Sequence, residues 1–415
     1  MAVVKPFRGF RPKKELVHLI ACRPYDVLNS DEAREEAKNN PHSFLHVTKS
    51  EIDLSNDIDI HSDLVYQKAK SNLENLIQQG VFVQDAAPCY YIYAQTFRGR
   101  TQFGIVGCAS VEDYLNDIIK KHELTRPDKE EDRKNHIRIT NFNAEPVFFV
   151  FPDNSEMDSI ISQTIAEAPV YNFRATDGVI HQLWIIGNKD LVNRIEDIFK
   201  NQVPFTYVAD GHHRTAAAAH VGEERKKLNP AHRGDEEYNY FLAVHFQASQ
   251  LTIIDYNRVV KDLNGNTADG FIRKLESAFE IQKMGPDEYK PAKLHEFSMY
   301  IEGNWYRLSA GKNTYNDDDP IDSLDVTILS SHILDPILGI TDLRKSTRIE
   351  FVGGIRGLGE LKKRVDSGEM AAAFALYPVS MDQLIKIADT GNIMPPKTTW
   401  FEPKLRSGLV LHCLD

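Results

Sequence analysis

The sequence predicts α+β or mixed α/β lobes, and three observations support this fold class. Strand-like and helix-like segments alternate irregularly along the chain, which favours such lobes over a doubly wound parallel sheet. The chain has 415 residues, and because domains usually span roughly 100–200 residues, two or three lobes are expected. Hydrophobic residues make up 42% of the chain and charged residues 26%, a composition that is typical of globular proteins and excludes a disordered chain.

The first predicted lobe covers residues 1–140. Its expected elements, in chain order, are a helix over 64–80, a hairpin of strands over 89–97 and 102–109, and a helix near 111–121. The first of these helices has apolar residues at helical spacing and stops at Gly80, a common helix terminator. A highly charged stretch follows at 122–136, and we expect Pro127 to interrupt any helix that crosses it.

The second predicted lobe covers residues 141–262, and the third covers 263–415. The elements expected in the second lobe are a strand over 146–151, a helix near 155–167, a hairpin that turns at Asp177-Gly178, a helix over 188–200, a strand over 205–209 that runs into an alanine-rich helix, and strands over 240–247 and 251–259. The best linker candidate is 261–270. In the third lobe the clearest elements are a hairpin at Gly303-Asn304 and a long helix near 322–338.

Composition excludes several classes of protein. The net charge of −11 disfavours generic binding to a phosphate backbone, so no nucleic-acid partner is expected. No window approaches the ~18 consecutive apolar residues of a membrane span, and the N-terminus lacks the apolar stretch of a signal peptide. The four cysteines form no Cys-x-x-Cys pair, which indicates free thiols in a reducing compartment. We therefore expect a cytoplasmic protein with no membrane partner.

The strongest local signal is Ala209-Asp210-Gly211-His212-His213-Arg214, at a predicted strand-to-helix junction. A helix N-terminus presents unpaired N–H groups and a partial positive charge, so it attracts anions. Gly211 permits close approach of the backbone, and the planar guanidinium of Arg214 suits phosphate. We assign phosphate binding to Gly211, His213, Arg214 and Thr215, and catalysis to Asp210 and His212. The same residues are also compatible with a capped helix whose first turn is merely polar.

The charged stretch 122–136 is a second candidate cluster. Asp132 and His136 are four residues apart, hence on one helix face, and are candidate metal ligands. Lys129 and Arg133 share that spacing and could grip phosphates, and Glu123 is a candidate catalytic carboxylate. The alternative is a solvated surface, which charge runs usually form.

A third candidate is the proline-rich segment 393–404, which carries Lys397, Trp400 and Phe401. Its three prolines and two aromatic residues indicate a rigid loop, a common platform for functional groups. We assign Lys397 to nucleotide binding. The alternative is a structural loop that packs its two aromatic rings.

Together these clusters resemble a known family. The segments that carry the resemblance are PFRGFRP (6–12), PYDVL (24–28), NPHSFLHV (40–47), HELTRPDKEEDRKNH (122–136), ADGHHR (209–214), YNRVV (256–260), FVGGIRG (351–357) and IMPPKTTWFEPKLRSGL (393–409). The chain is identified as a member of the family catalogued as domain of unknown function 1015, with a resemblance that runs from about residue 5 to about residue 412 in unchanged order.

The resemblance implies a nucleotide-binding element of the ParB and sulfiredoxin-like fold. Proteins of that fold hold nucleotide phosphates at a helix start, and free-serine kinases use it with a D-G-H-x-R motif similar to residues 210–214. This implies an ATP- or ADP-dependent kinase of a small hydroxyl metabolite, most plausibly free L-serine, which gives O-phosphoserine and uses Mg²⁺. Asp210 or Glu123 would accept the hydroxyl proton or hold the Mg²⁺. The alternatives are a nucleotide-binding regulatory protein without turnover and a phosphohydrolase, and a homo-oligomer is possible.

Overall fold

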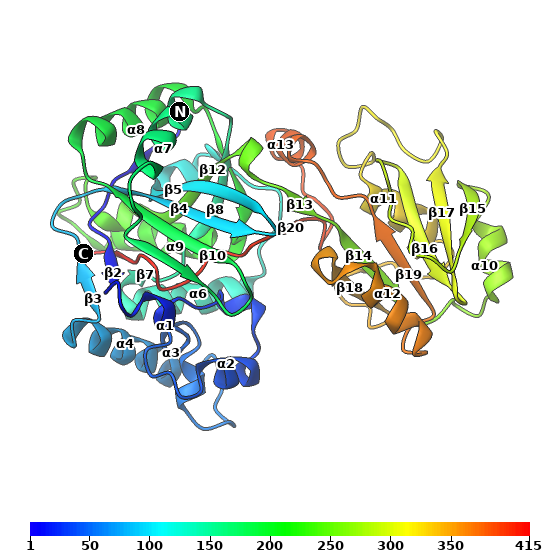
Figure 1. The fold of residues 1–415 in the computed structure, drawn as a ribbon, viewed down its shortest axis with the longest axis horizontal. Coiled ribbons are helices and arrows are strands. Elements are labelled where there is room, and N and C mark those ends of the chain that lie inside the picture. The colour runs from blue at the N-terminus through cyan, green and yellow to red at the C-terminus, as the bar shows by residue number, and fades with distance from the viewer. The chain divides into compact units, whose positions relative to one another are not determined.

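The computed structural model describes residues 1–415, which form two compact units (Figure 1). Unit 1 comprises Met1–Leu251 and Pro403–Asp415, and unit 2 comprises Thr252–Glu402. The chain thus leaves unit 1 and returns to it at its C-terminus, where β21 (His412–Cys413) pairs antiparallel with β7 (Phe142–Asn143). The predicted mixed α/β fold class is confirmed.

Unit 1 is built on a nine-stranded mixed sheet. Its path runs β6-β11-β8-β12-β5-β4-β10-β9, with β1 paired to β5. The strands are β1 (Val4–Lys5), β4 (Tyr90–Phe97), β5 (Arg100–Ser110), β6 (Ile119–Lys120), β8 (Val147–Phe151), β9 (Tyr171–Arg174), β10 (Ile180–Ile186), β11 (Thr206–Asp210) and β12 (Tyr240–Gln247). Because β5 pairs with β12, a boundary at residue 140 would separate strands of one sheet.

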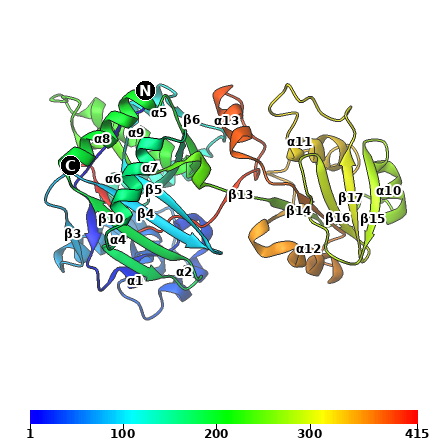
Figure 2. The same ribbon diagram turned by 45° about the horizontal axis from the view of Figure 1, so that its top comes forward.

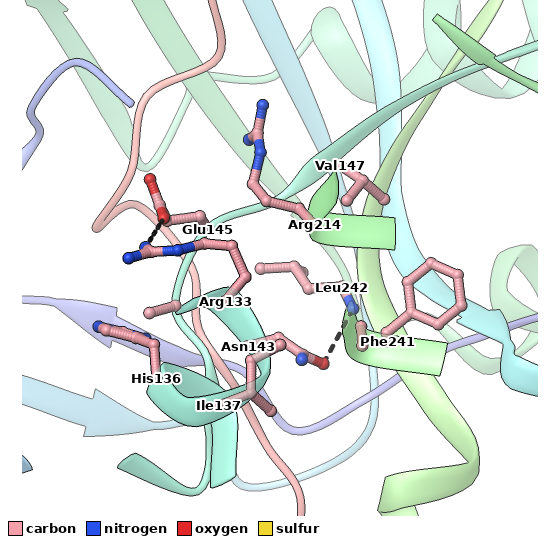
Figure 3. A pocket seen from close by; sticks show the side chains of 11 residues that line it. Arg133, His136, Ile137, Asn143, Glu145, Val147, Arg214, Phe241 and Leu242 are labelled. Atoms are coloured by element: carbon pink, nitrogen blue, oxygen red, sulfur yellow. Dashed lines mark hydrogen bonds and ion pairs between the residues drawn. The ribbon is translucent and has the colours of Figure 1, made fainter. Parts of the chain in front are cut away.

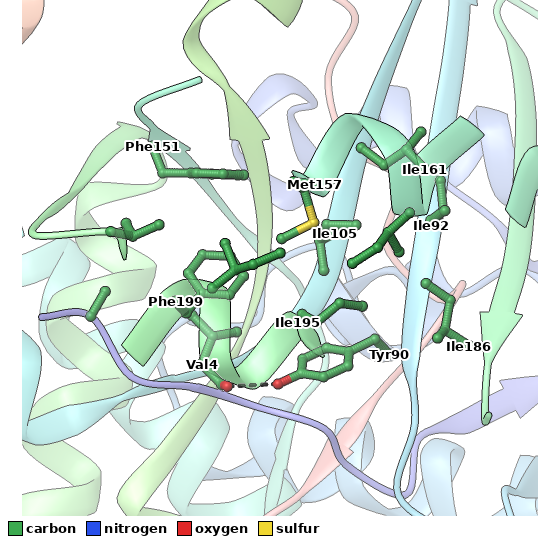
Figure 4. Packing of buried hydrophobic residues seen from close by; sticks show 14 of the residues in the cluster. Val4, Tyr90, Ile92, Ile105, Phe151, Met157, Ile161, Ile186, Ile195 and Phe199 are labelled. Carbon is green, nitrogen blue, oxygen red and sulfur yellow. Dashed lines mark hydrogen bonds between the residues drawn. The ribbon is translucent and has the colours of Figure 1, made fainter. Parts of the chain in front are cut away.

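Two clusters of buried apolar side chains join this sheet to its helices. One lies between the sheet and helices α7 (Ser155–Ile165) and α8 (Lys189–Gln202), and includes Met157, Phe199 and Tyr90 (Figure 4). The other joins the sheet to α6 (Pro127–Thr140) and the alanine-rich α9 (His212–Leu228). The small alanine side chains let α9 lie close against the sheet, which fixes the position of its first turn.

The remaining elements of unit 1 lie before and between these. They are β2 (Phe10–Pro12), α1 (Val17–Ile20), α2 (Ser30–Ala37), α3 (Leu45–Thr48), α4 (Asp63–Gln78), β3 (Phe82–Gln84) and α5 (Val111–Leu115). A third apolar cluster packs α2, α3 and α4 together and includes Leu411 of the returning C-terminal segment.

Unit 2 contains a six-stranded antiparallel sheet of order β15-β17-β16-β19-β14-β18 (Figure 2). Its strands are β14 (Tyr256–Val260), β15 (Phe279–Gly285), β16 (Glu296–Ile301), β17 (Asn304–Ala310), β18 (Ile349–Gly353) and β19 (Ala372–Leu376), and its helices are α10 (Ala268–Leu275), α11 (Asp325–Leu329), α12 (Gly357–Asp366) and α13 (Met381–Asp389). A separate pair joins β13 (Ile253–Ile254) to β20 (Trp400–Phe401). Because β14 belongs to this sheet, a boundary at residue 262 would separate it from its partner strands.

Several predicted elements differ in length from those observed. The helix predicted near 111–121 ends at Leu115, and 119–120 form strand β6 instead, because Asp117 takes a left-handed conformation (φ 55°) that stops the helix. Pro127 does not interrupt a helix but begins α6, where its missing N–H is not needed. The helix predicted near 322–338 is limited to α11 and a π-helical turn at Ser330–Leu334. No helix combines the length and apolar composition needed to cross a bilayer.

Candidate anion and metal site at the start of helix α9

The junction between β11 and α9 presents an uncapped helix N-terminus. The pairing of β11 with β8 shifts register between Val208 and Asp210, so the strand bulges at Ala209 and redirects its last residue. Gly211, the residue before the helix, has a φ of +91° and no side chain to cap the first turn. The free N–H groups and the helix dipole therefore create positive potential at this point.

Arg214 lies in this first turn and is buried, with 6% of its surface exposed. Its Nη1 donates to the carbonyl oxygen of Pro146 at 2.6 Å, but its Nε has no hydrogen-bond partner. Its Nη2 lies 3.7 Å from Asp210 Oδ2 and 4.0 Å from Asp26 Oδ2, beyond normal hydrogen-bond distance. The bond to Pro146 thus fixes the position of the guanidinium, and its Nε–H is available to a ligand.

The two carboxylates beside Arg214 differ in their electrostatic setting. Burial acts to raise the pKa of Asp210, but Lys404 and Arg214 outweigh it and lower that pKa to about 2. Lys404 Nζ lies 3.2 Å from Asp210 Oδ2. Asp26 is partly desolvated by its surroundings, which raises the pKa of its carboxyl although Arg214 opposes the change. The side chain of Asp26 is 41% exposed and that of Asp210 is 27% exposed. The site is therefore open to solvent at these two carboxylates.

His212, the first residue of α9, faces His122 and Glu123 in the loop after β6. Its Nδ1 lies 3.7 Å from Glu123 Oε2, and its ring is perpendicular to that of His122 with centroids 4.5 Å apart. Burial lowers the pKa of His122 to about 4 and lowers that of His212 well below its usual value. The structure therefore brings together Asp210, His212 and Glu123, the three predicted catalytic residues.

The other residues predicted at the α9 junction have internal partners. His213 Nε2 accepts a hydrogen bond from the backbone N–H of Arg126 at 3.0 Å. The hydroxyl of Thr215 is fully buried and donates to the carbonyl oxygen of Gly211. His213 Nε2 and the hydroxyl of Thr215 are therefore already engaged and do not provide phosphate-binding groups.

Several charged side chains of the stretch 122–136 are buried, although its composition predicts a solvated surface. Arg133 is buried between Asp132 and Glu145 and lies over the ring of Tyr25, 3.9 Å from its centroid. Asp132 accepts hydrogen bonds on both oxygens, from Tyr66 and Arg133 among others. Few lone pairs of this carboxylate remain for the predicted metal ion.

A small cavity of about 20 Å³ lies beside these residues (Figure 3). Its walls include Arg133, His136, Glu145 and Arg214. Figure 3 shows the ion pair of Arg133 with Glu145 on one side, with the guanidinium of Arg214 pointing away from that pair. His136 Nε2 is hydrogen-bonded to the carbonyl oxygen of Val47 at 3.0 Å. The space suits a water molecule rather than a nucleotide.

The roles of the two predicted lysines are not tested by the structure. Lys129 is half-buried on α6, and its role in phosphate binding stays a prediction. Lys397 belongs to unit 2, where its carbonyl oxygen accepts a hydrogen bond from Arg258 at 2.9 Å and its Nζ lies 5.8 Å from the centroid of the Tyr256 ring. Its role in nucleotide binding stays a prediction as well.

Sequence reasoning missed Asp26 and Lys404. Both lie in segments that carry the family resemblance, which was the one available signal. No periodicity or spacing could bring either residue to Asp210, because the contacts depend on how distant parts of unit 1 pack. His122 belongs to the charged stretch 122–136, whose composition gives no sign that this histidine is buried beside His212.

Comparison with known proteins identifies a family and several similar structures. The family model described as "Protein of unknown function (DUF1015)" matches residues 4–327. No curated protein matches the sequence. Similar solved structures include a conserved hypothetical protein from Pyrococcus furiosus (14% identity, TM-score 0.33, covering 70% of this chain and 90% of that one). Others are a free serine kinase in complex with AMP (13%, 0.33, 69% and 84%) and C-terminally truncated SbnI from Staphylococcus aureus (12%, 0.37, 72% and 82%).

Proposed function

The chain belongs to the DUF1015 family, and from the site at the start of α9 we propose that it is a nucleotide-dependent phosphotransferase acting on a small hydroxyl metabolite. The observation that carries the proposal is Arg214, a buried guanidinium with an unpartnered Nε at an uncapped helix N-terminus. A buried polar group without a partner costs free energy unless a ligand satisfies it. A phosphate oxygen has the charge and the geometry to do so.

Asp26 and Asp210 would repel a phosphate unless their charge is offset. Lys404 partly offsets the charge of Asp210. A divalent cation such as Mg²⁺ can offset the remaining negative charge, because carboxylate oxygens together with substrate phosphates are the ligands it prefers. Asp210, which stays ionised, fits this role better than Asp132, whose oxygens are engaged by protein donors. When bound, the ion would neutralise charge on the phosphates.

The carboxylates of the site differ in how readily they would accept the proton of the acceptor hydroxyl. In the transfer, the acceptor hydroxyl oxygen forms a bond to the terminal phosphorus, the bond from that phosphorus to the departing nucleotide breaks, and the hydroxyl proton passes to a carboxylate. Asp210, with a pKa of about 2, is a weak base. Asp26, whose carboxyl pKa is raised by burial, is therefore the better proton acceptor, with Glu123 as the second candidate, and Asp210 would stay charged to hold the cation and orient the phosphate-binding groups.

In its finer form the proposal is an ATP- or ADP-dependent kinase of free L-serine. This form rests on the resemblance of residues 210–214 to the D-G-H-x-R motif of free-serine kinases. The test is to incubate the purified chain with ATP or ADP, Mg²⁺ and a panel of amino acids, and to follow phosphorus by NMR. O-Phosphoserine supports the finer form, and another phosphorylated hydroxyl supports the broader one. Release of orthophosphate alone indicates a phosphohydrolase, and binding without turnover indicates a regulatory protein.

A further inference from the structure

His122, Glu123 and His212 form a cluster whose donor atoms all lie within 4.8 Å of one another. We propose that these three side chains bind one divalent transition-metal ion, of which Zn²⁺ is the representative case. The site is distinct from the carboxylate pair Asp26 and Asp210, and a metal ion held by Glu123 leaves Asp26 as the proton acceptor of the proposed transfer. Because the metal can be titrated without nucleotide, the proposal stands or falls independently of phosphoryl transfer.

The first support is the state of the two imidazoles. His122 is 1% exposed, and neither of its ring nitrogens makes a hydrogen bond of normal geometry, although the backbone of Val208 lies beside the ring. His212 is 6% exposed, with an unpartnered Nε2, and it turns its Nδ1 towards Glu123. Buried polar atoms are nearly always satisfied by protein, water or a bound ion. The buried His122 ring, which lies against His212 with centroids 4.5 Å apart, is therefore the main sign of a bound species.

The second support is the composition and spacing of the donors. Two imidazoles and one carboxylate are the ligands of an open zinc site, in which a fourth position is left for water or substrate. With zinc–ligand bonds of about 2.0–2.1 Å, tetrahedral donor atoms lie about 3.3 Å apart. His212 Nδ1 and Glu123 Oε2 are 3.7 Å apart, and all three donors lie within 4.8 Å of one another, so metal binding requires donor pairs to close by at most about 1.5 Å.

The third support is access. Glu123 is 43% exposed, so an ion can reach the buried histidines from solvent by way of this carboxylate. His213 does not compete, since its Nε2 accepts from the backbone of Arg126. Imidazole donors favour Zn²⁺ and neighbouring transition metals over Mg²⁺ and Ca²⁺, which prefer oxygen. The cluster should therefore discriminate against Mg²⁺.

The test is metal binding by the full chain after chelator treatment. We expect calorimetry and metal analysis to give one Zn²⁺ per chain, retained in the presence of excess Mg²⁺, and Co²⁺ to give the visible absorption of a tetrahedral site. Glu123→Gln and His122→Phe should each weaken Zn²⁺ binding at least about tenfold. His220→Ala, which removes a more exposed histidine of α9, is the control and should bind normally.

Zn²⁺ should also raise the melting temperature of the wild type and of His220→Ala, because a ligand of the folded state stabilises it. If His122→Phe does not fold, Glu123→Gln decides the matter, since its side chain reaches solvent. Binding of less than one Zn²⁺ per chain in the wild type, or undiminished binding in Glu123→Gln, would overturn the proposal.

Discussion

The guanidinium of Arg214 packs against the backbone of Gly211: a methyl group added to Gly211 would lie 3.1 Å from its Cζ, Nε and Nη2 atoms. Such a contact is tighter than side chains normally make, so the guanidinium would have to shift. Gly211 also has a φ of +91°, a conformation that costs an alanine about 1–2 kcal/mol. This glycine therefore serves the backbone turn and the placement of Arg214 at once.

We expect Gly211→Ala to lose stability and also to lose nucleotide affinity. Gly178→Ala is a matched control, because Gly178 has a φ of +84° but nothing within 4 Å of an added methyl group. Both variants should be destabilised by about 1–2 kcal/mol from backbone strain, as measured by urea unfolding. Only Gly211→Ala should bind nucleotide more weakly by calorimetry. Equal affinities in the two variants would show that the Arg214 contact is unimportant.

The carboxylates of the site should matter more to turnover than to nucleotide binding. We expect at least one of Asp210→Asn, Glu123→Gln and Asp26→Asn to lower phosphate transfer about 100-fold or more while binding nucleotide within about threefold of the wild type. Asp190→Asn, at an exposed position of α8, should be unaffected. Transfer and thermal stability are measured on the same preparations. Near-normal transfer in all three site variants would refute the assignment, and unfolding of all three would indicate structural roles.

Acid should destabilise unit 1 through its buried neutral histidines, and His245 is the cleanest case. It packs between Phe149 and Phe199, and burial lowers its pKa to about 4, against a weaker opposing hydrogen bond with the carbonyl of Ile105. At pH values between about 4 and the unfolded pKa of about 6.5, His245 is protonated in the unfolded chain but neutral in the folded chain. Stability is therefore complete above about pH 7 and falls as the pH drops towards 4.

The His245 contribution should be on the order of 2 kcal/mol between pH 7 and pH 5. We expect His245→Phe, which offers an aromatic ring of similar size to the same apolar surroundings, to lose less stability over this interval than the wild type does. Urea unfolding at several pH values measures the two slopes. Parallel slopes would mean that His245 is not the titrating group.

Local sequence patterns were sufficient for the elements that carry the site. The hairpin of β4 and β5 was predictable because its strands and turn are adjacent, although Arg100 and Thr101, expected in the turn, belong to β5, and Phe97 pairs with Arg100. The junction of β11 with α9 was predictable because a strand pattern meets an alanine-rich segment at Gly211. These features depend on neighbours in the chain.

The rest depended on contacts that a pattern does not encode. Asp132, Arg133 and His136 read as solvated surface or ligands, yet each is buried, because ion pairs and hydrogen bonds satisfy them inside unit 1. The approach of Asp26 and Lys404 to the α9 N-terminus is likewise a consequence of packing. Hydrophobic periodicity carries no information about buried charged groups that neutralise one another.

Calorimetric titration of ADP and ATP into wild type, Arg214→Ala and Arg194→Ala, each with Mg²⁺, is the most direct test of nucleotide binding by Arg214. Arg194 lies on α8 in an exposed ion pair with Glu156, so its loss controls for overall charge. We expect wild type and Arg194→Ala to bind alike. Folded Arg214→Ala should bind about 10–150-fold more weakly, which corresponds to the loss of one charge-assisted hydrogen bond of about 1.5–3 kcal/mol. Unchanged affinity in a folded Arg214→Ala protein would contradict this role of Arg214.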